Sequence, residues 1–159
     1  MSNGSALRYQ DTSQGGVTSS VLPTSDSTYR RFQSAFDAEP QRRWEVEAVR
    51  QLVKFADLPE NWDSYGSTRL KKDAGHFALE ILQKIMRPRT PIPQIVPTST
   101  GGVQLEWHEK GIDLEINILG AYDCELWYRD RQTQSPPVAA TFSNDFSLLR
   151  DPIGQLTSR

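Results

Sequence analysis

The sequence has few of the residues that bind metal ions or form covalent intermediates in proteins. Its 159 residues include one cysteine, Cys124, and two histidines, His76 and His108. A single cysteine excludes a disulfide within the chain and a zinc site of four thiolates. Because Cys124 lies inside an expected strand, we predict a buried and unreactive thiol. Only two imidazoles are available as a general base, so we expect neither nucleophilic catalysis nor a bound cofactor.

Long apolar runs and nucleotide-binding motifs are also missing. No segment approaches the ~20 apolar residues of a membrane span. The first ten residues, MSNGSALRYQ, lack the apolar stretch of a secretory signal. We therefore expect a cytoplasmic protein without membrane association. The net charge of −2 gives no overall attraction to nucleic acid, and no phosphate-binding glycine motif occurs.

The N-terminal part of the chain is polar. Eleven of residues 1–28 are serine or threonine, which leaves too little apolar surface to offset the entropy of folding. Residues 29–43 mix aromatic and arginine side chains, and Phe32 and Phe36 are one helical turn apart. Such a segment can stack on nucleic acid or pack across a neighbouring helix, and its acidic residues favour packing. We expect residues 1–40 to form a disordered or partly ordered tail.

The apolar residues of the rest of the chain change their spacing near Pro93. Over 41–56 and 68–87 they recur every three or four residues, which predicts two amphipathic helices. Beyond Pro93 they alternate with polar residues, which is typical of antiparallel strands with one buried face. The sequence thus predicts an α+β domain over 41–150, with two helices packed on one face of a three- to five-stranded antiparallel meander. Residues 151–159 are expected to fray.

The segment Glu60–Gly66 combines turn-forming residues with two large aromatic side chains. Aromatic residues on a loop are typical of protein-binding surfaces. In the alternative interpretation both rings are held in the core. We favour a non-catalytic binding or regulatory protein that acts through a protein partner. The expected partner-binding residues are Glu60, Asn61, Trp62, Asp63, Tyr65 and Trp107.

A second candidate surface is the polar face of the expected hairpin. Glu106 and His108 lie two apart on one strand, and Asp113 and Glu115 lie two apart on the next, so each pair points the same way. A two-residue loop places His108 opposite Asp113, whereas a four-residue loop places Glu106 there. These side chains could bind a metal ion in a hydrolase or nuclease, which is our first alternative function. Their spacing matches no known metal motif, so we expect an ordinary solvated sheet face and no metal site.

Charge is unevenly distributed along the chain. Residues 67–94 contain six basic and two acidic residues, a balance of +4, and residues 101–128 contain six acidic and one basic, a balance of −5. Patches of opposite sign favour a charged partner or a homo-oligomer. The second alternative, a nucleic-acid-binding accessory protein, is less favoured. It would use Arg30, Arg31, Arg42, Arg43, Lys71 and Lys72.

Two short segments together resemble a known pattern. They are NWDSYG at 61–66 and GGVQLEW at 101–107. The pair resembles a group of small uncharacterised bacterial proteins that carry an NWDSYG…GGVQLEW pattern, over about residues 45–130. The resemblance implies kinship with that group, and it implies no established activity.

Overall fold

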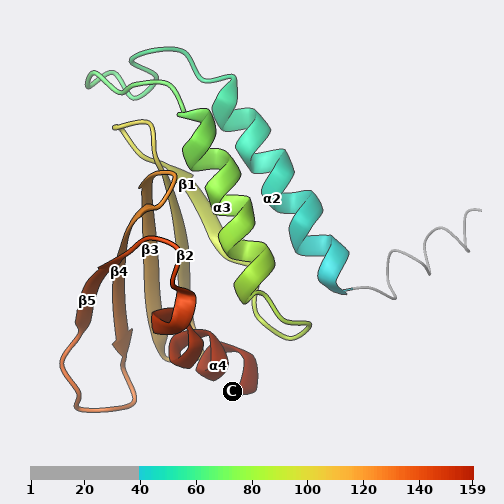
Figure 1. Ribbon diagram of the computed structural model, residues 1–159, viewed down its shortest axis with the longest axis vertical. Coiled ribbons are helices and arrows are strands. Elements are labelled where there is room, and N and C mark those ends of the chain that lie inside the picture. The colour runs from blue at the N-terminus through green and yellow to red at the C-terminus, as the bar shows by residue number, and fades with distance from the viewer. Residues whose placement is uncertain (1–39) are drawn as a thin grey trace, which may run out of the picture.

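The computed structural model of the protein describes residues 40–159 (Figure 1). Two helices come first, then five strands, and then a short 3-10 helix that leads into a last α-helix. The elements are α2 (Pro40–Ala56), α3 (Lys72–Ile85), β1 (Gln94–Pro97), β2 (Val103–Glu109), β3 (Ile112–Gly120), β4 (Asp123–Asp130), β5 (Val138–Phe142), η1 (Phe146–Leu149) and α4 (Arg150–Ser158). The tail expected over 1–40 lies outside the described residues, except for Pro40, where α2 begins.

The five strands form one antiparallel meander in the order β1-β2-β3-β4-β5. On β2 and β3 every second side chain is buried, as the alternating sequence predicts. These buried side chains form the core face of the sheet, and the polar residues between them form the open face. The α+β prediction with an antiparallel meander is therefore confirmed, with five strands. The fifth, β5, follows directly after Pro136 and Pro137.

All described helices lie on the core face of the sheet (Figure 1). Helix α3 packs over β2 and β3 and buries Phe77, Ile81 and Leu82. Helix α2 runs antiparallel to α3, contacts both α3 and β1, and buries Trp44 and Ala48. Spacings of three and four place each buried set on one side of its helix. No helix among residues 40–159 is long and apolar enough to cross a membrane.

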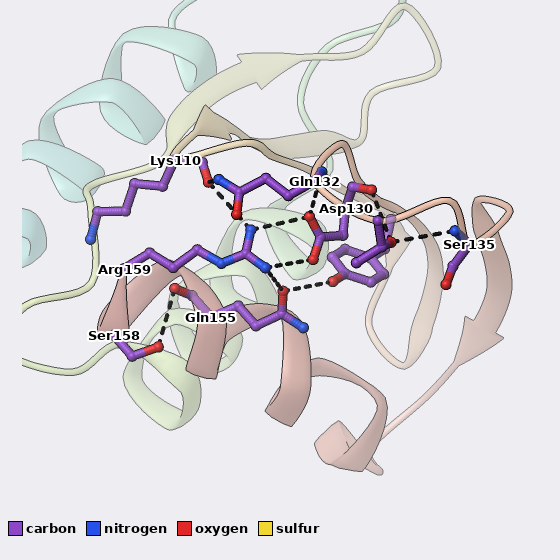
Figure 2. Close-up of polar contacts among 9 residues, drawn as sticks. Lys110, Asp130, Gln132, Ser135, Gln155, Ser158 and Arg159 are labelled. Carbon is purple, nitrogen blue, oxygen red and sulfur yellow. Dashed lines mark hydrogen bonds and ion pairs between the residues drawn. The ribbon is translucent and has the colours of Figure 1, made fainter.

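The C-terminus differs from the expected frayed segment over 151–159. Residues Arg150–Ser158 form α4, a third helix on the sheet, and bury Ile153 and Leu156. The final residue, Arg159, donates to both carboxylate oxygens of Asp130, at 3.1 and 2.5 Å (Figure 2). A helix of nine residues is too short to be stable alone. The burial of its apolar side chains and this bidentate ion pair together hold it in place.

The Arg159–Asp130 ion pair leads to a first prediction. Asp130 is a buried carboxylate, and removal of its partner leaves it uncompensated. We expect Arg159→Ala to lower the thermal unfolding midpoint measured by circular dichroism. The matched control is Arg129→Ala, an exposed arginine beside Asp130 on β4, which should change the midpoint little. Equal midpoints for the two variants would contradict the role of α4 docking.

The same pair should make stability depend on acid pH. The hydrogen bonds from Arg159 hold the pKa of Asp130 below its ordinary value of 3.8. A carboxyl group with a lower pKa in the folded state stabilises the fold above its unfolded pKa, and this contribution is lost as pH falls through the folded pKa. The difference in midpoint between wild type and Arg159→Ala should therefore shrink below pH 3.8. A difference that stays constant down to pH 2 would exclude the ion pair as its cause.

Candidate functional site

The loop Glu60–Gly66 lies beyond the end of α2 and is closed by its own hydrogen bonds. The backbone N–H of Asn61 donates to the carbonyl of Ser67 at 2.7 Å, and that of Ser64 donates to the carbonyl of Asn61 at 3.0 Å. The side-chain oxygen of Asn61 accepts from the N–H of Gly66 at 2.6 Å. Asn61, Ser64 and Gly66 all have positive φ angles, a conformation that asparagine and glycine adopt most readily. The turn-forming residues thus shape the loop locally.

Asp63 holds the second half of this loop. Its Oδ1 accepts from the backbone N–H of Tyr65 at 2.8 Å and from that of Ser67 at 3.2 Å. The first of these bonds is the main reason why the pKa of Asp63 lies below its ordinary value of 3.8. Asp63 is consequently charged at neutral pH, and at least one of its oxygens is engaged inside the loop rather than free for a partner.

The three aromatic residues of the expected site occupy different environments. Tyr65 is 93% exposed and stands out from the loop, whereas Trp62 is half-buried. Trp107 is buried on the core face of β2, and its Nε1 donates to the carbonyl of Pro91 at 2.8 Å. The structure therefore gathers Glu60 to Tyr65 in one loop and leaves Trp107 out of it. The alternative in which both loop rings are held in the core does not describe Tyr65.

The segment after the loop joins it to the β1–β2 hairpin. The N–H of Thr68 donates to the carbonyl of Ser99, and the N–H of Lys71 donates to that of Gly101, both at 2.9 Å. Gly101 has a φ of +80°, and a Cβ atom on it would lie 2.5 Å from the carbonyl oxygen of Arg69. Only glycine fits so close a contact without a shift of the backbone.

This contact joins the segment that begins at Gly101 to the residues just after the loop. The sequence predicts that the second helix spans 68–87. In the structure residues 67–71 pass along the hairpin instead, and α3 begins at Lys72. The residues that directly follow NWDSYG thus lie against the hairpin at the start of GGVQLEW, and they anchor the end of the loop to the sheet.

The polar hairpin residues are arranged as one of the two alternatives predicted. His108 lies opposite Asp113, and Glu106 lies opposite Glu115, so Lys110 and Gly111 form a two-residue loop. His108 Nδ1 is 3.1 Å from Asp113 Oδ1, and His108 Nε2 is 3.7 Å from Glu106 Oε2.

The carboxylates of this face also have other partners. Asp113 lies 3.3 Å from Arg131 Nε, and Glu115 accepts from Gln104 at 3.2 Å. Within residues 40–159 no three His, Cys, Asp or Glu side chains are placed to hold a metal ion. The carboxylates are paired with neighbours across the sheet rather than gathered around one point.

The described basic residues of the nucleic-acid alternative do not form one patch. Arg43 lies near the start of α2, whereas Lys71 and Lys72 lie at the start of α3. Because the two helices are antiparallel, these residues are at opposite ends of the helical layer (Figure 1). Lys71 Nζ also donates to the carbonyl of Leu119 at 3.0 Å. Arg30, Arg31 and the side chain of Arg42 lie outside the described part of the chain.

The lone cysteine has the environment that the sequence predicts. Cys124 is buried on the core face of β4. Burial raises its pKa to about 12, which keeps the thiol protonated at neutral pH. A protonated, buried thiol is a poor nucleophile.

One aromatic residue of the open sheet face was missed by the sequence analysis. Trp127 points to the open face, between Glu115 on β3 and Ala139 on β5. It lines a shallow hollow of about 490 Å³ together with Asn117 and Glu125. The sequence pattern could have predicted this position. Trp127 stands between Leu126 and Tyr128, whose side chains point to the core face, so its own side chain points to the opposite face.

No protein family, curated protein or solved structure matches the chain. The resemblance to small bacterial proteins with the two-part pattern accordingly stays a prediction.

The glycine contact gives a second prediction. Gly101→Ala puts a side chain where the backbone has positive φ and where the carbonyl of Arg69 leaves no room. Strain of this kind costs roughly 1–3 kcal/mol, so urea denaturation should show a loss of that order. The matched control is Gly154→Ala inside α4, where a Cβ atom meets nothing within 4 Å. That change should stabilise the fold by roughly 0.5–1 kcal/mol. If both variants changed the free energy of unfolding in the same direction, the close contact at Gly101 would be contradicted.

Proposed function

We propose that this protein is a non-catalytic binding or regulatory protein that captures a protein partner through the loop Glu60–Gly66. The observation that carries the proposal is the 93% exposure of Tyr65 on a loop fixed from both sides. An isolated exposed ring is unremarkable in a mobile segment. Here the backbone N–H groups of Tyr65 and Gly66 donate hydrogen bonds to the side-chain oxygens of Asp63 and Asn61, which hold the backbone on each side of the ring.

A fixed loop lowers the cost of binding. A partner does not need to order a loop that is already ordered, so more of the contact free energy appears as affinity. Tyrosine loses little side-chain entropy on burial and presents a large apolar area with one hydroxyl group. These properties suit Tyr65 as the central side chain of a small interface.

The charge around Tyr65 indicates the chemistry of the partner. Glu60 is exposed in the same loop, and Asp63 is charged while it holds the loop closed. A complementary surface would have an apolar pocket for the ring and a lysine or arginine at its rim. Rim charges of this kind mainly speed association and select the partner.

The proposal predicts that Tyr65→Ala abolishes partner binding without loss of stability. The test is affinity purification of tagged full-length protein from its native host, with quantitative mass spectrometry of retained proteins. Val138→Ala is the matched control, because Val138 is another exposed apolar residue and lies at the opposite end of the sheet (Figure 1). Wild type and Val138→Ala should retain the same partner, and Tyr65→Ala should lose at least tenfold of it at an unchanged unfolding midpoint. Equal retention by all three proteins, or a partner retained by none, would refute the proposal.

A further prediction separates the ring from its support. Asp63→Ala keeps Tyr65 but leaves the N–H groups of Tyr65 and Ser67 without their acceptor. We expect a weaker partner interaction and faster proteolytic cleavage between 60 and 67. The control is Glu80→Ala, which removes an exposed carboxylate on α3, outside the loop. If Asp63→Ala binds as wild type does, loop closure has no part in binding.

A further inference from the structure

Helix α2 has apolar side chains on more of its surface than the core requires. Trp44, Ala48 and Leu52 are buried against α3 and the sheet. On the other side, Val46, Val49 and Val53 are each between 46% and 57% exposed. Spacings of three and four place these three valines in one row along the helix. Polar residues would normally occupy such a solvent-facing row.

This valine row continues into an apolar groove between α2 and α3. The groove has a volume of about 280 Å³. Val49 and Val53 form one wall, Leu70 and Leu79 form the other, and His76 lies at the rim. Single exposed apolar residues are common on proteins, but a row that leads into an apolar groove marks a binding surface.

We propose that the surface is covered by residues 29–39 of the same chain, with Phe32 and Phe36 seated along the valine row and in the groove. These residues directly precede Pro40, the first residue of α2. Their aromatic side chains supply the apolar area that the row lacks. This inference is independent of the partner-binding function of the Glu60–Gly66 loop.

The lengths of the two segments agree. Phe32 is eight positions from Pro40, a distance of about 26 Å in extended form. The 17 residues of α2 are also about 26 Å long. Phe36 is four residues from Pro40 and reaches about 13 Å, which is the rise of α2 from Pro40 to Val49. A chain that turns back at Pro40 therefore places Phe36 beside Val49 and allows Phe32 to reach the groove at Val53.

Two observations favour this occupant over a second copy of the protein. A stable dimer needs about 800 Å² of buried surface per partner, whereas three valines and a small groove offer less. A covalently attached segment also binds at an effective concentration in the millimolar range.

A disulfide experiment tests the proposal in the full chain. Phe36→Cys is combined with Val49→Cys and oxidised under mild conditions. Cys124 does not compete, because it is buried and protonated. The control pair combines Phe36→Cys with Glu47→Cys, on the opposite side of α2 at a similar height. We expect an intrachain disulfide at least fivefold faster in the first pair, with the linkage mapped by mass spectrometry.

Each other outcome overturns the proposal. Equal rates for the two pairs mean that residues 29–39 have no preferred place on α2. Disulfides between chains, with a dimer in size-exclusion chromatography, mean that a second copy covers the surface. As a second measurement that needs no cysteine, Phe36→Ala should lower the unfolding midpoint of the full chain, and Arg50→Ala, an exposed change on α2, should not. Equal midpoints for these two variants also contradict the proposal.

Discussion

The apolar face of the five-stranded sheet must be covered, and this single requirement determines where the helices lie. Side chains at alternate positions of β2 and β3 point to the same side and are fully buried. Helix α3 covers their centre, α2 flanks it, and α4 covers the end at which the chain finishes. The opposite face keeps its polar residues in water, where His108 lies close to the carboxylates of Glu106 and Asp113. The described residues consequently form two layers, one of helices and one of strands. The candidate functional residues lie on the open sheet face and in the loops at one end.

At that end, the loop Glu60–Gly66 and the β1–β2 hairpin form one structural unit. Hydrogen bonds from Thr68 and Lys71 reach the hairpin carbonyls, and the close approach at Gly101 permits them. Hydrogen bonds inside the loop then fix its backbone around Tyr65. The loop between α2 and α3 is thereby held in one conformation by its contacts with the sheet. A binding site needs support of this kind from a rigid element.

Regular periodicity explains what the sequence could predict. Alternation placed the strands and the core face correctly, and positive φ angles at Lys110 and Gly111 fit the two-residue turn that sets His108 opposite Asp113. Helix α4 could not be predicted because Ile153 and Leu156 give one helical turn of signal, and its order depends on the distant Asp130. The candidate site was predicted only in part. The alternation of apolar and polar residues along β2 already placed Trp107 with Val103 and Leu105 in the core. The exposure of Tyr65 depends instead on the backbone angles of its loop, and the spacing of apolar residues does not predict those angles.

Within residues 40–159 the five-stranded sheet is open, and its two edge strands, β1 and β5, each pair with one neighbouring strand. Exposed edges invite pairing with the strands of other molecules, which leads to aggregation. Strand β1 is only four residues long, ends at Pro97 and follows Pro93, and proline offers no N–H to an incoming strand. Strand β5 follows two prolines and has five residues. The short, proline-flanked edge strands therefore protect the open meander from pairing with strands of other molecules. Contacts with other molecules are then made by side chains of the loops and helices.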